Sequence, residues 1–159
     1  MNDPLTIYLH DHLTGSNFAV ELLDGWRTTY RDEPLGRLAA DLHREIEEDR
    51  VTLRGIIDRI GGETHPFKET VGWIAEKAAG FKLRREENLA LGVFEGLEML
   101  ALGILGKRSL WAALDLLAST DRRLQGLDFP RLAERATGHH ARVEAQRLGM
   151  IIAVFGSAR

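Results

Sequence analysis

The sequence predicts an all-α protein built as a four-helix bundle, and three observations support this fold class. Apolar residues recur at intervals of three and four along the whole chain, which is the spacing of amphipathic helices. No run of alternating β-branched residues and no Asn-Gly hairpin signal is present. Proline, glycine and capping residues divide the chain into helical segments, four of them long. We therefore expect residues 1–159 to form one helical-bundle domain.

The first two helices are expected to form an antiparallel pair. The first begins after Asp3-Pro4 and runs to about residue 30, because an acidic cap followed by proline is a typical helix start. The second covers about residues 34–60 and ends at Gly61-Gly62. Only the short turn around Asp32 separates the two helices, so we expect them to be antiparallel neighbours.

The other two long helices are expected in the second half of the chain. One covers about residues 86–105 and ends at Gly106. The last is opened by Asp128 and runs over about residues 130–155. Four long amphipathic helices, with two short helices in their connections, predict an up-down four-helix bundle.

Two short additional helices are expected in the connections of this bundle. The first covers about residues 66–84, and the second covers about residues 110–119 with Ser109 as its cap. The sequence therefore predicts a bundle of four long helices with two short helices added.

Composition excludes several classes of function. The net charge is −3, whereas nucleic-acid binders usually carry a basic excess, so we expect no nucleic-acid partner. The chain has no cysteine, which excludes disulfides and thiolate metal sites. The most apolar stretch, Met99 to Leu105, is far shorter than the ~20 residues that span a bilayer, so we expect no membrane contact. The first residues lack a basic region followed by a long apolar run, so we expect no signal peptide and a cytoplasmic location. No nucleophile that would define an enzyme stands out.

Ionisable side chains fall on the apolar faces of four of these helices, where an unpaired charge is energetically unfavourable. The six residues concerned are His12, Asp49, Glu98, His140, Glu144 and Arg147. Glu45 and Glu95 lie at the edges of the same faces. His10, His43 and His139 are expected at the surface. This set of inward-facing polar residues is the strongest indication of function in the sequence.

The short turn at Asp32 sets the relative heights of the first two helices. Pairing them about that turn places Asp49 level with Ser16 and His12 level with Leu53. His12 and Asp49 are then about one helical turn, ~5–6 Å, apart along the bundle axis. We therefore expect the two side chains to share one centre.

The second helix carries an interior carboxylate, the helix at about residues 86–105 carries another, and the last helix carries a His/Glu pair. This pattern resembles that of the ferritin-like superfamily. The number of helices and the long crossover are also similar, and the chain looks most like divergent, uncharacterised bacterial members of that superfamily. The resemblance implies a site for one or two divalent cations, iron or manganese. The candidate ligands that it implies are Glu45, Asp49, Glu95, Glu98, His140 and Glu144, with His12 added through its nearness to Asp49.

The spacing of these ligands departs from the motif of the superfamily. Its two-metal site takes a Glu from each of two helices and Glu-x-x-His from each of the other two. Here Glu45-x-x-Glu48 and Glu95-x-x-Glu98 keep that spacing with a carboxylate in place of the imidazole. The pair His140-x-x-x-Glu144 inverts its order.

Two alternatives use the same residues. His139-His140-x-x-x-Glu144 resembles one ligand motif of the hemerythrins, a family that needs several more histidines on the other helices. A metal-free structural or interaction protein would instead hold Asp49 and Glu98 in a buried network with Arg147 and His140. The sequence leaves metal binding and this ionic network open as explanations.

A second apolar face on the first helix favours a protein partner. Ile7, Phe18 and Leu22 lie opposite the main apolar stripe of that helix. An exposed apolar strip often marks an interface. We therefore expect a homodimer that buries these residues, or a short helix packed across them.

Overall fold

The structure, a computed structural model, describes residues 3–61 and 88–156. These residues are almost entirely helical and contain no strand, which confirms the all-α class. The elements are four long helices, one turn of 3-10 helix and one short helix: α1 (Pro4–Thr29), α2 (Pro34–Ile60), α4 (Leu89–Ala118), η1 (Arg122–Leu124), α5 (Phe129–Gly149) and α6 (Ile151–Phe155).

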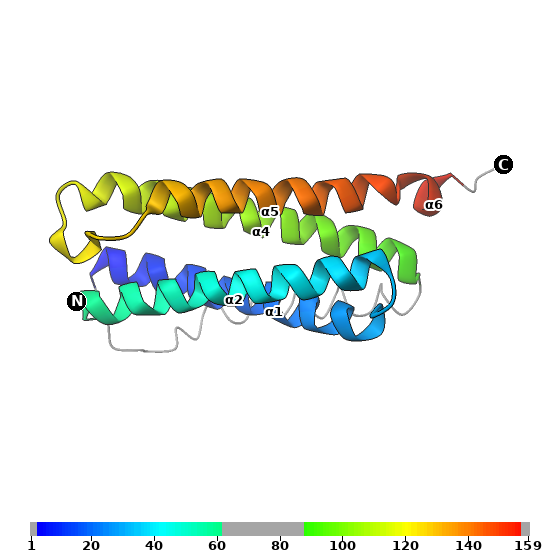
Figure 1. Ribbon diagram of the computed structural model, residues 1–159, viewed down its shortest axis with the longest axis horizontal. Coiled ribbons are helices and arrows are strands. Elements are labelled where there is room, and N and C mark those ends of the chain that lie inside the picture. The colour runs from blue at the N-terminus through cyan, green and yellow to red at the C-terminus, as the bar shows by residue number, and fades with distance from the viewer. Residues whose placement is uncertain (1–2, 62–87, 157–159) are drawn as a thin grey trace.

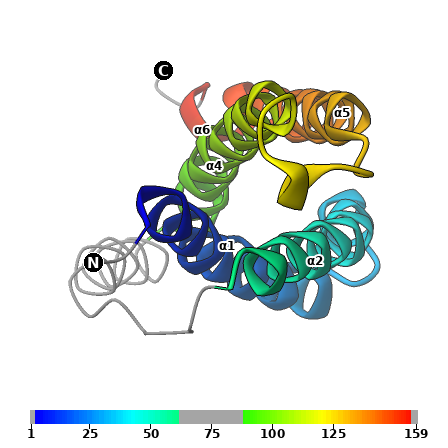
Figure 2. The same cartoon turned by 90° about the vertical axis from the view of Figure 1, so that its left-hand side faces the viewer.

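The four long helices form two antiparallel hairpins that pack on each other (Figures 1 and 2). Helices α1 and α2 make one hairpin, and α4 and α5 make the other. Figure 1 shows that α2 and α4 run in the same direction, as do α1 and α5. A hydrogen bond from Arg59 to the carbonyl oxygen of Gln125 joins the hairpins at one end, with an N···O distance of 3.4 Å. The helices therefore run up, down, down and up.

Capping residues begin the helices where the sequence predicts. The carboxylate of Asp3 accepts a hydrogen bond from the Leu5 amide at 3.3 Å, and Asp128 caps α5 through the Arg131 amide at 3.0 Å. Helix α2 ends at Gly61, whose φ of +82° is a left-handed conformation that favours glycine. These starts and stops follow from local backbone chemistry.

The expected break in α4 does not occur. The helix continues through Gly106 to Ala118, and the Ser109 hydroxyl donates to the Leu105 carbonyl within the helix instead of capping a new one. Glycine in a helix interior is unfavourable by about 1 kcal/mol, a penalty that burial of Leu110 and Trp111 beyond it readily exceeds. The prediction of a separate short helix at 110–119 is therefore wrong. The other predicted short helix, at 66–84, lies outside the described residues.

The last predicted helix is interrupted near its end. Helix α5 stops at Gly149, and the short helix α6 follows Met150. Figures 1 and 2 show α6 as one turn at the end of α5, and it contacts α4. The prediction of one continuous helix to about residue 155 is therefore wrong beyond Gly149.

Gly36 lets the turn between α1 and α2 close tightly. A Cβ atom at this position would collide with the backbone of Tyr30. The same Tyr30 carbonyl accepts a hydrogen bond from the Glu33 amide at 2.9 Å. The glycine therefore fixes the relative height of the two helices.

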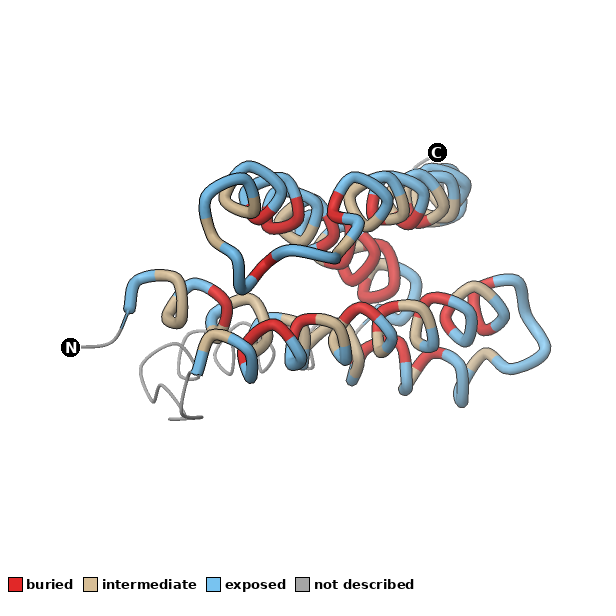
Figure 3. The backbone as a smooth tube through the Cα atoms, turned by 60° about the vertical axis from the view of Figure 1, so that its left-hand side comes forward, coloured by how far each residue is buried: buried red, intermediate tan, exposed pale blue. Residues whose placement is uncertain are grey.

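The core lies between the two hairpins (Figure 3). Its largest fully buried side chains are Trp26, Trp111 and Phe129. Helix α4 contributes most, with mean hydropathy 1.7 over its most apolar window, so it is long and apolar enough to cross a membrane. It contacts α1, α5 and α6, and a helix at the centre of a bundle has the same composition.

The second apolar face of α1 is covered to different degrees. Leu22 is buried, and Ile7 and Phe18 are half-buried. Phe18 lines a cavity described below. Homodimerisation through this face stays a prediction.

Candidate functional site

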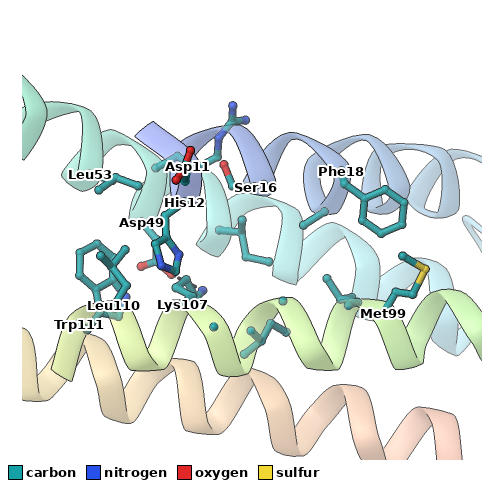
Figure 4. Close-up of a pocket in the computed structure, with 18 residues that line it drawn as sticks. Asp11, His12, Ser16, Phe18, Asp49, Leu53, Met99, Lys107, Leu110 and Trp111 are labelled. Atoms are coloured by element: carbon teal, nitrogen blue, oxygen red, sulfur yellow. Dashed lines mark hydrogen bonds and ion pairs between the residues drawn. The ribbon is translucent and has the colours of Figure 1, made fainter. Parts of the chain in front are cut away.

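A cavity of about 350 Å³ lies among α1, α2 and α4 (Figure 4). Most of its wall is apolar, and six of the residues that form this part are Phe18, Leu53, Met99, Ile104, Leu110 and Trp111. Glycines at positions 15, 103 and 106 also line it. The cavity therefore provides space for an apolar molecule between three helices.

Six polar residues from three helices line this cavity. Asp11, His12 and Ser16 come from α1, Asp49 and Arg50 from α2, and Lys107 from α4. The Lys107 ammonium donates to Oδ2 of Asp49 at 2.5 Å. The side chain of Asp49 is 3% exposed and that of Lys107 15%, so this is a buried ion pair. Burial lowers the pKa of Lys107, and the charge of Asp49 opposes that effect.

His139 on α5 lies behind this ion pair. It is 2% exposed, and its Nδ1 lies 3.0 Å from Nζ of Lys107. Burial, followed by the charge of Lys107, lowers the pKa of His139 to about 3, so the ring is neutral at pH 7. Because Lys107 can only donate, Nδ1 must accept and the ring proton belongs on Nε2. Nε2 lies 2.8 Å from Oε2 of Glu45, off the line of a good hydrogen bond.

Two arginines of α5 complete the cluster. Arg135 lies 3.4 Å from Oδ1 of Asp49 and donates to Glu48 at 2.5 Å, which lowers the pKa of that carboxyl. Arg142 donates to Glu45 at 2.9 Å. We call the following set the Asp49–Lys107 cluster: Glu45, Glu48, Asp49, Lys107, Arg135, His139 and Arg142. Its three carboxylates, three cations and neutral histidine are balanced in charge.

The structure places His12 and Asp49 as the turn register predicts. Both line the same cavity, together with Ser16 and Leu53. The register is also visible in a hydrogen bond from Arg50 on α2 to Asn17 on α1, 2.5 Å long. His12 is half-buried, with its ring edge against Tyr8, and burial lowers its pKa.

The remaining predicted residues lie apart from this cavity. Glu98 is exposed, and Glu95 and His140 are half-buried. Glu144 accepts two hydrogen bonds from Arg147, at 2.7 and 2.9 Å, within α5. The Arg147 guanidinium also lies 5.1 Å from the centre of the Phe94 ring.

The expected network of Asp49 with Arg147 is therefore replaced by two separate groups. Asp49 pairs with Lys107 and Arg135, whereas Arg147 pairs with Glu144. The reason is height along α5. His139 lies opposite Asp49, and Arg147 is eight residues further, about 12 Å along the axis.

The described carboxylates are not gathered in the way that the two-metal site of the ferritin-like resemblance implies. In residues 3–61 and 88–156, no three side chains of metal-binding type come together. Glu45, Asp49 and Glu144 are instead each matched by a lysine or arginine, whose positive charge opposes a second cation. The donor set favours an ionic network.

Sequence reasoning missed Lys107 and His139. Lys107 follows Gly106, where the helix was expected to end, so it was not placed on a helix face. An uninterrupted helix puts Lys107 in line with Ile104 and Trp111, and this periodicity was the available signal. His139 was expected at the surface, and that prediction is wrong. It is spaced three and four residues from the buried Ala136 and Val143.

Comparisons with known proteins gave no relative. No protein-family model, no curated protein and no solved structure matches the chain significantly. The cavity and the Asp49–Lys107 cluster at its wall are therefore the features that indicate a function.

Proposed function

We propose that this protein is a small-molecule-binding helical bundle. It binds one largely apolar molecule in the cavity among α1, α2 and α4, and the Asp49–Lys107 pair supplies the polar contact. The volume of about 350 Å³ lies within the range of ligand sites, which run from about 300 to 1,000 Å³. Such sites are mostly apolar with a few convergent polar groups, and this wall has that composition.

The observation that carries this proposal is a buried ion pair on the wall of an apolar cavity. Removing two charges from water is so unfavourable that apolar residues of similar volume often stabilise a protein as well or better. Stability therefore does not explain why Asp49 and Lys107 face the cavity. Recognition of a bound molecule explains their position, because polar contacts are stronger in the low-dielectric surroundings of the cavity wall.

The architecture also supports a ferritin-like connectivity as a proposal about the fold. The up-down-down-up order of the helices and the long connection between α2 and α4 agree with it. Iron or manganese binding stays a prediction that has less support than the small-molecule site, because cations already pair with the carboxylates. Cytoplasmic location likewise stays a prediction.

The experiment compares two glycine variants in calorimetric titrations with octanol. Gly103 lines the cavity, and a side chain added there meets no atom within 4 Å, so Gly103→Leu should fill the space. Gly55 on α2 is exposed and equally open, but it lies outside the cavity, so Gly55→Leu is the matched control. Both changes remove a helix-interior glycine and should preserve folding.

The expected result is saturable one-to-one binding to the wild type and to Gly55→Leu, with at least a tenfold loss for Gly103→Leu. Absence of saturable binding to the wild type would overturn the proposal. Equal binding by all three proteins would also overturn it, because the molecule would then occupy another place.

A further inference from the structure

The cavity differs in chemistry along its length. Figure 4 shows His12, Asp49 and Lys107 close to one another, with Phe18 and Met99 further along the helices. All five residues line the same space. A molecule that fills it therefore meets polar groups at one part and only apolar side chains at the other. This is the pattern that an amphiphile with a polar head and an apolar chain would complement.

The polar part offers donors that lack an acceptor. An ammonium group has three N–H bonds, and Lys107 directs them to Asp49 and His139, which leaves one. Trp111 lies four residues further on the same face of α4 and lines the same cavity. Its Nε1 is buried and has no hydrogen-bond partner among the described residues. A buried donor of this kind is usually satisfied, so an acceptor oxygen is the group that fits here.

The charge balance disfavours a charged head group. The carboxylates and cations of the Asp49–Lys107 cluster match in number, and Arg50, which also lines the cavity, is paired with Glu47 at 2.5 Å. An additional carboxylate would stand beside Asp49, and an additional ammonium beside Lys107. Either would be a buried charge without a counter-charge. Asp11 is exposed, where water and salt screen its charge.

We infer that the ligand is an uncharged amphiphile of the acyl amide, ketone or ester class. Its carbonyl oxygen accepts hydrogen bonds from Nζ of Lys107 and Nε1 of Trp111, and its chain lies along Phe18 and Met99. This inference rests on the proposed function and adds the chemical class of the ligand.

The test compares four probes of equal chain length in calorimetric titrations: octanamide, octanoate, octylamine and octane. Octanamide should bind about tenfold or more tightly than each of the others, as expected for one or two buried hydrogen bonds made without an unpaired charge. Tighter binding of octanoate or octylamine would overturn the inference and leave the small-molecule site standing. Equal binding of octane and octanamide would do the same. No binding of any probe would overturn the proposed function itself.

Variants separate the two donors from general packing. Trp111→Phe keeps an aromatic ring and removes the N–H, so it should reduce the preference for octanamide over octane several-fold. Trp26→Phe is the matched control, because Trp26 is equally buried with an unpartnered Nε1 and lies outside the cavity. Lys107→Met should remove most of the same preference. An unchanged preference in both Trp111→Phe and Lys107→Met would contradict the assignment of the head group.

Discussion

The two ionic groups of this bundle contrast in position and in what they join. The centre of the Asp49–Lys107 cluster is buried and links α2, α4 and α5, with a lysine whose side chain is 15% exposed. The Glu144–Arg147 pair joins residues three apart on α5, and its side chains are 26% and 19% exposed. Both are short, well-formed contacts. Of the two, the first lies at a cavity and forms ion pairs between separate helices, so contact distance alone does not reveal which ionic group matters.

The largest loss of stability should come from removing one partner of the buried Asp49–Lys107 pair. Lys107→Met leaves the Asp49 carboxylate buried without its nearest cation, and we expect a loss of about 3–5 kcal/mol in the free energy of unfolding. Urea denaturation measures it. The double variant Asp49→Leu, Lys107→Met should recover most of that loss, because both charges are gone. A single variant as stable as the wild type would contradict the buried position of this pair.

Acid should weaken the Asp49–Lys107 cluster through His139. Its pKa is about 3 in the folded protein and 6.5 ordinarily, so the unfolded chain takes up a proton over this window before the folded protein does. The free energy of unfolding should therefore fall as pH drops from about 6.5 to 3, with a contribution of at most about 1.4 kcal/mol per pH unit.

Denaturation of His139→Gln across the same pH range tests that contribution. Glutamine keeps an acceptor for Lys107 and does not titrate, so the variant should lose stability less steeply than the wild type. Parallel curves for the two proteins would show that His139 is not held neutral by burial.

The Glu144–Arg147 pair should contribute little to the free energy of unfolding. Arg147→Met removes the partner of Glu144, but water can solvate that carboxylate, and the methionine can still pack against Phe94. We expect urea denaturation curves close to those of the wild type. A loss as large as that of Lys107→Met would remove the contrast between the two groups.

Metal ions should have the smallest effect. If the Asp49–Lys107 cluster is complete as an ionic network, adding Mn²⁺ or Fe²⁺ should leave the Tm unchanged, because only a ligand that binds the native state raises it. Elemental analysis of protein purified without chelator is the companion measurement. Stoichiometric iron or manganese that disappears in Asp49→Asn would restore the ferritin-like metal site.

Local signals in the sequence predicted most of the fold. Asp3, Asp128 and Gly61 mark helix ends because capping and left-handed backbone conformations depend on neighbouring residues alone. The turn register that brought His12 and Asp49 to one cavity is similarly local. The prediction that Gly106 ends the helix was wrong, because burial of the residues beyond it outweighs the penalty of about 1 kcal/mol for glycine in a helix interior.

The candidate site was predicted less well, because it depends on contacts between distant segments. Asp49 was found from its own helix face, but its partner is 58 residues further along the chain. The choice of His140 over His139 was an error of one position, which turns a side chain by about 100° around the helix. Sequence periodicity indicates that a charge is buried. The partner of that charge depends on the height at which the two hairpins pack.

Helix α4 is unbroken over 30 residues, or about 45 Å. About 20–25 Å of this length separates the contact between Phe94 and Phe155 from the part of the cavity wall that Lys107 and Trp111 form. A rod transmits tilt and axial rotation along its whole length, whereas two helices joined at Gly106 would absorb them at the joint. The position of the short C-terminal helix and the shape of the cavity are therefore mechanically tied through one element.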